Sequence, residues 1–469
     1  MTQNKLTITP TSIDGLLVVN LPLHGDKRGW FKEHWQREKM VHLGLPDFAP
    51  VQQNISFNSA LGTTRGIHAE PWDKYVSVAN GSAFGAWVDL REGPGFGRKF
   101  TIELTPERAV FVPRGVANSF QTLEPNTAYM YLVNDHWSPQ AQYTFVNLAD
   151  PELDIAWPIP LSQATVSEKD MEHPYLADVS PVRSKETVVI GAGGQLGRAL
   201  RDVLSLESAR FVDRPDIDLS STQSIEGYDW DNVDVIINAA AYTAVDQAET
   251  PEGRRTAWQV NATALGTLAK IANKHRATLV TVSTDYVFDG TVSNHTEQEE
   301  FTPQSVYGQT KAAGEIASRG TPQHYIVRTS WVVGEGNNFV RTMAKLAHNG
   351  VNPKVVDDQF GRLTFASELA RGIKHLLDTN APFGTYNLSG SGEITSWFTI
   401  ATEVFKLLDH DPNRVTPVPS KEYELEQTSL GKTLAPRPMH SAFDLSKIEA
   451  TGFQAEDHLL TLKKYLLGE

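Results

Sequence analysis

The hydrophobic pattern of the chain changes near residue 180, and this change separates two kinds of fold. Before it, short β-rich runs are divided by glycine, proline and asparagine turns. After it, apolar strands alternate with helical segments. Closely spaced strands predict a sandwich or barrel, whereas alternating strands and helices predict a parallel sheet covered by helices. The length of 469 residues suits more than one domain of ordinary size.

The segment between the two patterns, residues 171–186, is polar, contains two prolines and has no amphipathic period. These properties are typical of a linker. We therefore expect an all-β domain over residues 1–180 and an α/β domain over residues 187–469.

Five β-rich runs predict strands of the first domain, at residues 74–79, 83–90, 99–104, 109–112 and 128–133. Arg65, His68 and Lys74 come just before or at the start of the first run. A base beside a cation suits proton abstraction next to a carbonyl, because the enolate oxygen needs stabilising. The alternative is a histidine whose hydrogen bonds are satisfied in the core or at the surface.

The second domain begins with a glycine-rich loop. The sequence VVIGAGGQLGRAL places Gly191, Gly194 and Gly197 after a short strand and at the start of a helix. Glycines there permit a tight turn and the close approach of a pyrophosphate to the helix N-terminus. Asp213, which ends the next strand, is placed to bind adenosine ribose hydroxyls and favours NADH. Arg214 could meet a 2′-phosphate, so NADH and NADPH both stay open.

The stretch 279–315 combines a buried strand, a loop and a helix start. The apolar run, residues 279–282, stops at Ser283, Thr284 and Asp285, and open α/β sheets bind ligands at the carboxyl ends of their strands. Tyr307 and Lys311 follow at a spacing of four, which places them one turn apart on one helix face. A hydroxyl, a tyrosine and a lysine so arranged suit a carbonyl/alcohol interconversion. A core tyrosine beside a solvated lysine is the alternative.

Composition excludes several classes of function. The chain has no cysteine, so disulfides, thiolate metal sites and a cysteine nucleophile are excluded. Its net charge is −14 without a Lys/Arg-rich tract, which argues against nucleic acid as a partner. No apolar run reaches membrane-spanning length and the N-terminus is not of signal-peptide type, so we expect a cytoplasmic protein without a membrane partner.

The first domain resembles the dTDP-4-dehydrorhamnose 3,5-epimerases over residues 10–175. The motifs GDKRGWFKE, VQQNIS, RGIH, DLREGPGFG, PRGVANSF, YLVNDHWSP and AWPIP–LSQATVSEKD occur in the family's order. The resemblance implies a cupin-type β-jelly roll that forms a homodimer. It implies that His68 is the base, Asp170 orients it, Lys74 stabilises the enolate and Tyr131 returns a proton. It also implies that the nucleotide is held by Arg28, Glu33, Gln52, Asn54 and Arg65.

The chain departs from that family at four positions. Gly85 stands where the family usually has aspartate, Asn118 where it has histidine, Leu132 where it has lysine and Glu70 where it has glutamine. These changes alter the surroundings of the acid–base group. We expect no metal, because His68 lacks the nearby histidine or glutamate partners of a cupin metal site.

The second domain resembles dTDP-4-dehydrorhamnose reductase, in the extended short-chain dehydrogenase/reductase superfamily, over residues 186–467. The matching segments are NAAAYTAVDQAE, STDYVFDG, YGQTKAAGE, VRTSWVVGEGNNFV, VVDDQFGRLT, GTYNLSG and RPMHSAFDLSK. The resemblance implies a Rossmann fold with a small substrate-binding subdomain, in which Tyr307 donates a proton. Lys311 lowers the tyrosine pKa and binds the nicotinamide ribose, and Thr284 bonds the substrate oxygen. One departure is Leu363, where the family often has proline, and we expect it to affect a loop.

The resemblance and the glycine loop together give two sets of binding residues. We expect the cofactor, NADPH or NADH, to contact Gly191, Gly194, Gln195, Leu196, Gly197, Asp213, Arg214, Asp218, Leu219, Ala239, Ala240, Ala241, Tyr307 and Lys311. We expect the sugar nucleotide to contact Tyr242, Thr243, Asp285, Trp331, Asn338, Arg437 and Ser441. Each has a structural alternative: Trp331 could be a core residue, and Asn338 could cap a helix that starts near Phe339.

The two resemblances concern consecutive steps in making dTDP-L-rhamnose from a dTDP-linked keto sugar, so they predict a bifunctional enzyme. Three alternatives stay open. The first half could be a non-catalytic sugar-nucleotide-binding or dimerisation module. The second half could be a binding homologue without turnover. It could also be a 4-epimerase or dehydratase that keeps NAD bound.

Overall fold

The computed structural model describes residues 5–138, 141, 143–183, 185–206 and 208–468, which fall into two compact units, residues 1–184 and 185–469. Residues 171–183 do not form the expected linker. Leu176 is buried in the first unit, and the Val182 N–H donates to Leu90 O (2.7 Å). The strand that opens the second unit begins at Glu186.

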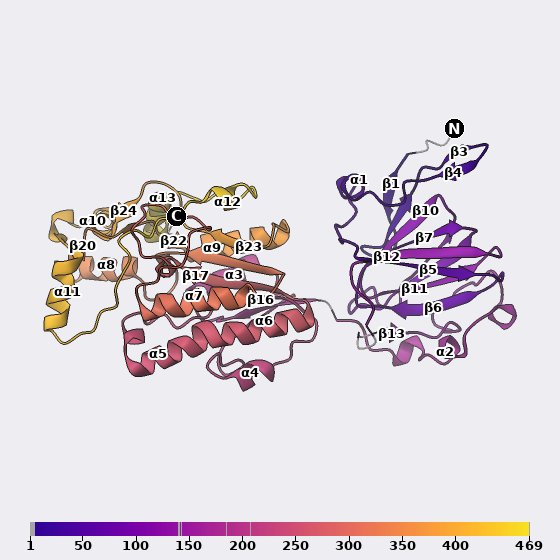
Figure 1. Cartoon of the computed structure of the whole chain (residues 1–469), viewed down its shortest axis with the longest axis horizontal. Coiled ribbons are helices and arrows are strands. Elements are labelled where there is room, and N and C mark those ends of the chain that lie inside the picture. The colour runs from indigo at the N-terminus through magenta and orange to yellow at the C-terminus, as the bar shows by residue number, and fades with distance from the viewer. Residues whose placement is uncertain (1–4, 139–140, 142, 184, 207, 469) are drawn as a thin grey trace. The chain divides into compact units, whose positions relative to one another are not determined.

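The first unit consists of two antiparallel sheets (Figure 1). Their inner faces share a core around Trp87, Val110 and Tyr129. The six-stranded sheet has the order β1 (Thr7–Pro10), β2 (Leu17–Asn20), β10 (Arg108–Val112), β7 (Lys74–Asn80), β12 (Thr127–Val133), β5 (Gln52–Asn58). The five-stranded sheet has the order β13 (Thr144–Phe145), β6 (Thr64–Ala69), β11 (Val116–Thr122), β8 (Ala83–Asp89), β9 (Lys99–Leu104). The remaining elements are the β3 (His24–Asp26) and β4 (Gly29–Phe31) hairpin and the helices α1 (Arg37–His42) and α2 (Glu168–Met171).

The five runs expected as strands of this unit are confirmed as β7, β8, β9, β10 and β12. Six further strands of its sheets, β1, β2, β5, β6, β11 and β13, were not anticipated. In β5 every second side chain is covered and the others are exposed. Its sequence, QQNISFN, also lacks the apolar content that is expected of a buried strand. Pairing with β12 holds it in place.

The second unit is built on a six-stranded parallel sheet. Its order is β15 (Ala209–Val212), β14 (Glu186–Ile190), β16 (Val233–Asn238), β17 (Thr278–Thr284), β18 (His324–Thr329), β23 (Gly384–Asn387). Neighbouring residues of β14 point to opposite faces: Val189 packs with α3 (Gln195–Val203) and α9 (Ala366–Asp378), and Val188 packs with α6 (Ala264–His275). Both faces of the sheet are therefore buried, as the Rossmann prediction requires.

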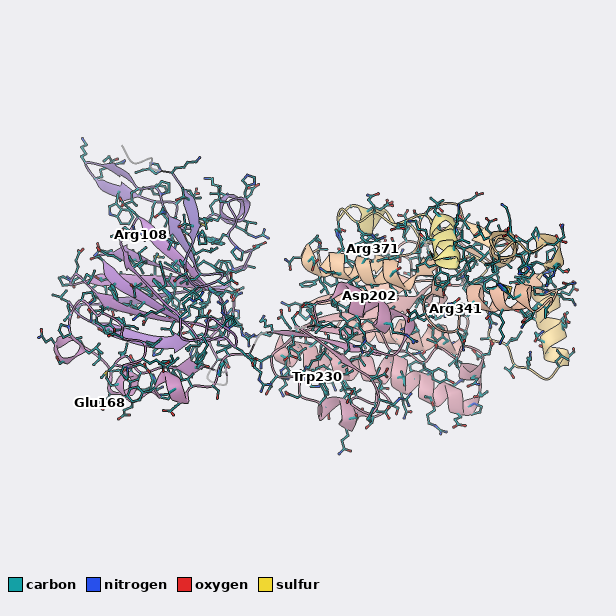
Figure 2. All side chains as sticks on the ribbon, turned by 180° about the vertical axis from the view of Figure 1, so that it is seen from behind. Arg108, Glu168, Asp202, Trp230, Arg341 and Arg371 are labelled. Atoms are coloured by element: carbon teal, nitrogen blue, oxygen red, sulfur yellow. The ribbon has the colours of Figure 1, made fainter. Side chains whose placement is uncertain are left out.

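Other helices and short strands complete the unit. Around the sheet these are α4 (Thr222–Glu226), α5 (Pro251–Trp258) and α7 (Val306–Ser318). Trp230, labelled in Figure 2, is buried on the α6 face, and its indole N–H donates to Ile225 O (2.7 Å). No helix among the described residues is both long and apolar enough to cross a membrane. The cytoplasmic location expected from the sequence stays a prediction.

A separate core forms the rest of the second unit, around Phe365, Phe405 and Leu462. Its elements include α8 (Phe339–His348), α10 (Trp397–Leu407), α13 (His458–Leu467) and the pairs β19 (Val332–Val333) with β22 (Thr364–Phe365), β20 (Lys354–Val356) with β25 (Thr416–Val418) and β21 (Phe360–Gly361) with β24 (Thr395–Ser396). Two further helices are α11 (Ser420–Ser429) and α12 (Ser446–Glu449). Leu363 is fully buried here, and its N–H donates to His458 Nδ1 (3.3 Å), a bond that proline could not make.

Candidate active sites

A cavity of about 820 Å³ opens at the carboxyl ends of β14, β16 and β17 in the second unit. Parallel sheets bind ligands at this edge, where the chain reverses its direction across the sheet. Such a reversal occurs at β14, because the next two strands along the chain, β15 and β16, lie on opposite sides of β14 in the sheet. The cavity therefore lies at the position that the glycine loop predicted.

The glycine loop fits a dinucleotide by its backbone. Gly191 has φ +91°, and a Cβ there would lie 2.8 Å from Ala240 N, so only glycine fits. The Gly193 N–H donates to Asp213 Oδ2 (2.8 Å), which holds that carboxylate at the loop. Gly197 does not line the cavity. A Cβ at Gly197 would meet Gly191 O at 2.1 Å, so this glycine lets α3 pack against the loop.

The other expected cofactor residues all line this cavity: Gly191, Gly194, Gln195, Leu196, Asp213, Arg214, Asp218, Leu219, Ala239, Ala240, Ala241, Tyr307 and Lys311. Three lining residues that were not in the predicted set are Ser283, Thr329 and Ser330. Their buried hydroxyls have no hydrogen-bond partner among the described residues. Unpaired hydroxyls at strand ends and a glycine cradle fit a nicotinamide dinucleotide, which would supply partners for them.

Tyr307 and Lys311 lie in the first two turns of α7. This helix begins at Val306 because the Ser305 side chain accepts a hydrogen bond from the Gly308 N–H (3.1 Å). Thr284 ends β17 and faces the same cavity. The structure thus brings together the three residues that the sequence proposed as a proton-transfer group.

Burial sets the protonation of this group. It raises the pKa of Tyr307, an effect that nearby Asp285 reinforces and a hydrogen bond with Thr284 opposes. Burial lowers the pKa of Lys311 to about 8, against the influence of Glu315. Lys311 Nζ donates to Val282 O (2.6 Å). At neutral pH the tyrosine is therefore a phenol that can give a proton, and the lysine is a cation beside it.

Asp285 links the catalytic strand end to the C-terminal segment. It is buried and accepts hydrogen bonds from Thr284 Oγ1 (2.9 Å) and Ser441 Oγ (2.5 Å). Burial raises its pKa to about 6, although both hydroxyls stabilise the carboxylate.

A second cavity of about 370 Å³ shares Tyr286, Trp331 and Trp397 with the first. Trp331 and Trp397 stack at 3.7 Å between ring centroids, and Trp397 was missed from sequence because it reaches Trp331 only through the packing of α10. Arg437 and Ser441 line this smaller cavity. Arg437 is paired with Asp246 (2.9 Å).

The expected sugar-nucleotide residues Tyr242, Thr243, Asp285 and Trp331 line the larger cavity. Asn338 is the exception, because it lines neither cavity. It caps α8 by accepting from the Arg341 N–H (3.0 Å), and its amide donates to Gly334 O (2.8 Å). The neighbouring Asn337 lines the larger cavity instead.

The first unit contains its own cavity of about 490 Å³, lined by His68, Lys74, Tyr131 and Asp170. His68 Nε2 lies 2.9 Å from Asp170 Oδ1. Although burial raises it, hydrogen bonds from His68, Ser167 and the Gly66 backbone hold the pKa of Asp170 below its usual value. Nε2 of His68 therefore carries the proton that Asp170 accepts, and Nδ1 is left as the basic nitrogen.

Lys74 and Tyr131 occupy another side of this cavity. The Lys74 ammonium is buried, forms an ion pair with Glu70 and lies 5.4 Å from the Tyr131 ring centroid. Burial raises the pKa of Tyr131, and the negative charge of Glu70 raises it further. A protonated phenol and a cation thus face the same space as His68.

The structure explains two of the departures from the family pattern. A Cβ at Gly85 would lie 2.3 Å from Cη2 of the fully buried Trp87, so the indole fills the space that an aspartate would need. Asn118 accepts from the Tyr129 hydroxyl (2.9 Å) at the cavity wall. Leu132 packs in a different core cluster and does not line the cavity.

The expected nucleotide-binding residues of the first unit are not all gathered. Arg65 lines the cavity, whereas Arg28, Glu33, Gln52 and Asn54 do not. Arg28 pairs with Asp26 on the exposed β3–β4 hairpin, and Glu33 pairs with Lys39. Gln52 Nε2 donates to Asn54 Oδ1 (3.0 Å) on β5.

Contrary to the expectation from the sequence, His68 does have a histidine neighbour. His173 lies beside it, with ring centroids 5.6 Å apart. The sequence placed His173 in the supposed linker, and only the packing of that segment brings it to the site.

Comparisons with known proteins match each unit separately. The family model described as RmlD substrate binding domain matches residues 185–467, and the one described as dTDP-4-dehydrorhamnose 3,5-epimerase matches residues 10–178. The "Protein RmlC homolog" of Streptococcus pyogenes serotype M6 is 50% identical over 181 residues, which cover 37% of this chain and 91% of that protein.

The second unit has similar relatives among reductases. The dTDP-4-dehydrorhamnose reductase of Aggregatibacter actinomycetemcomitans is 36% identical over 296 residues, which cover 59% of this chain and 96% of that protein. The crystal structure of dTDP-4-dehydrorhamnose reductase from Bacillus anthracis in complex with NADP is 31% identical, with a TM-score of 0.55. That match covers 61% of this chain and 99% of the other.

Proposed function

We propose that two active sites catalyse consecutive reactions in this chain, which belongs to the RmlD family over residues 185–467 and to the dTDP-4-dehydrorhamnose 3,5-epimerase family over residues 10–178. It is a bifunctional enzyme of dTDP-rhamnose biosynthesis. The first unit epimerises dTDP-4-dehydro-6-deoxy-D-glucose at C3 and C5, and the second reduces the 4-keto group to yield dTDP-L-rhamnose. The observation that carries this is that each unit encloses a cavity with its own acid–base group.

In the first unit, His68 removes the proton next to the ketone. Asp170 fixes its tautomer and stabilises the imidazolium that forms. Lys74 offsets the negative charge that develops on the enolate oxygen. Tyr131, whose raised pKa keeps it protonated, returns a proton from the opposite face.

In the second unit, bound NADPH or NADH supplies the hydride for the C4 carbonyl. Tyr307 gives its proton to the carbonyl oxygen, and Thr284 hydrogen-bonds that oxygen. Lys311 stabilises the phenolate that is left and binds the nicotinamide ribose. Arg437 and Ser441 bind the nucleotide part of the substrate in the smaller cavity.

One experiment tests both reactions. The keto sugar is incubated with the chain in D₂O without cofactor, and deuterium at C3 and C5 is followed by NMR. NADPH or NADH is then added, and the product is identified. Without deuterium uptake, the first unit would be a non-catalytic sugar-nucleotide-binding or dimerisation module beside an active reductase. Without net cofactor oxidation, the reductase assignment fails in favour of a 4-epimerase, a dehydratase or a binding homologue.

We also propose that the first unit is a cupin-type jelly roll. Strands β5, β6 and β7 alternate between the two sheets, as do β9 to β13, which supports this topology. We propose separately that the elements packed around the core of Phe365, Phe405 and Leu462 form the substrate-binding subdomain of the second unit.

The chain forms a homodimer through the first unit. β5 lies at the edge of its sheet and exposes 64% of Ile55 and 62% of Phe57, which is unusual for a strand edge left in water. Phe57→Glu should convert the dimer to a monomer in sedimentation velocity. Leu425→Glu, on the exposed helix α11 of the second unit, is the control. A dimer that survives Phe57→Glu would refute this interface.

A further inference from the structure

A third polar side chain completes a cluster at the base of the first-unit cavity. Asp170 lies on α2, which begins at Glu168 (labelled in Figure 2), and His173 follows two residues after that helix ends. His173 Nε2 lies 3.5 Å from Asp170 Oδ1, the same oxygen that His68 Nε2 approaches at 2.9 Å. The His173 side chain is only 8% exposed, and its Nε2 has no hydrogen-bond partner among the described residues.

Phe145 holds both imidazoles in place. Its ring stacks on His173 at 4.6 Å and meets the edge of His68 at 5.2 Å. The mechanism proposed for epimerisation gives His173 no part. A buried imidazole nitrogen without a partner costs free energy, so its position beside a base and a carboxylate calls for a ligand.

Two of the three donor separations are close to those of a zinc site. Zinc binds imidazole nitrogen at about 2.0–2.1 Å and carboxylate oxygen at about 2.0–2.2 Å, so neighbouring ligands of a tetrahedral ion lie about 3.3 Å apart. The two measured separations, 2.9 and 3.5 Å, lie on either side of that value. All three donor atoms lie within 4.8 Å of one another. Two histidines and one carboxylate form a common protein donor set for zinc with an open fourth position.

Access from solvent also suits a metal. His68 and Asp170 line the cavity, which gives an ion a route from solvent and leaves room for a water as fourth ligand.

We propose that His68, Asp170 and His173 form a zinc-binding site whose occupation inhibits the epimerase. An imidazole that binds zinc through Nε2 carries its proton on Nδ1, so His68 can no longer accept a proton from the sugar. Zinc also takes over the carboxylate that orients the base. The inhibitory role rests on the proposed epimerase function, whereas metal binding itself does not.

Binding is measured first, without any assay of activity. The full chain is titrated with zinc by calorimetry and with Co²⁺ by absorbance in the visible range. We expect one site per chain that is weakened at least tenfold in both His173→Asn and His173→Phe, the second of which keeps an aromatic ring against Phe145. His24→Asn, at an exposed histidine of the β3–β4 hairpin, should bind as the parent chain does. Equal binding by the parent and the His173 variants would overturn the site.

Inhibition is measured next, on the same protein. Zinc should suppress deuterium uptake in the parent chain and leave uptake by the His173 variants largely unchanged. Reduction of the epimerised keto sugar by the second unit serves as the internal control and should not respond. Equal inhibition of all variants, or loss of uptake on treatment with a chelator, would overturn the inhibitory role. No uptake by any chain, with zinc binding intact, would instead refute the epimerase function.

Discussion

Tyr307→Phe removes the proton donor of the reductase site and almost nothing else. The phenylalanine ring keeps the edge-to-face contact with Tyr286, at 5.4 Å between centroids. The hydrogen bond with Thr284 is lost, which costs about 1 kcal/mol of stability. The backbone of α7 is unchanged because its cap is Ser305. The fold should therefore survive, and any loss of turnover reports the missing hydroxyl.

The expected loss follows from the role of the hydroxyl. A positioned general acid contributes about 10²–10⁴-fold to the rate. At about 1.36 kcal/mol per factor of ten, this equals about 3–5 kcal/mol of transition-state stabilisation. Because burial raises the pKa of Tyr307, the parent side chain is protonated across the neutral range, and all of this contribution is lost in the variant.

The assay follows NADPH oxidation at 340 nm with the epimerised keto sugar supplied directly. Cofactor affinity, measured by fluorescence titration, should stay within a few-fold, because Lys311 and the glycine loop are intact. That affinity would show that the second unit is folded, and deuterium uptake by the first unit should be unchanged. A variant that keeps more than a tenth of the parent kcat would refute the assignment of Tyr307 as the acid.

Three further predictions test the remaining groups. Asp170→Asn replaces the charge-assisted hydrogen bond of 2.9 Å to His68, which is worth about 1.5–3 kcal/mol, with a neutral one. Deuterium uptake should slow by about 10–100-fold while reductase turnover is unaffected. Unchanged uptake would remove Asp170 from the mechanism. Arg328→Met removes the buried partner of the buried Glu315 and should lower the free energy of unfolding in urea by about 3–5 kcal/mol. Arg319, whose side chain is 44% exposed, meets the same carboxylate, and Arg319→Met should lower the free energy of unfolding by no more than about 1 kcal/mol. Equal losses of stability in the two arginine variants would contradict the role of burial. Because burial lowers the pKa of Lys311 to about 8, reductase kcat should fall as pH rises through 8 and the cation is lost; a flat profile from pH 7 to 9 at saturating cofactor would contradict this.

Local patterns predicted the architecture of both units. The alternation of strands and helices after residue 187 predicted the parallel sheet of the second unit. Its strands could be recognised because a strand buried on both faces must be continuously apolar. Gly191, Thr284, Tyr307 and Lys311 were found because their geometry depends on a single loop, strand end or helix turn. The resemblance to known families added Asp170, which lies 102 positions after His68 and meets it at 2.9 Å.

What depended on non-local packing could not be predicted from the sequence. Strand β5 was missed because pairing with β12, and not its own apolar content, holds it in the sheet. Trp87 fills the space beside Gly85, a fact that requires the orientation of an indole in a closed core.

The sequence by itself determined two kinds of fold and two families, because these follow from periodicity and motif order, and it proposed the residues of each acid–base group. The tertiary structure alone decided that residues 171–183 pack on the first unit and carry His173 to His68. The free energy of that packing comes from contacts such as buried Leu176, made with strands distant in the sequence. A segment that is polar in sequence can therefore complete a site.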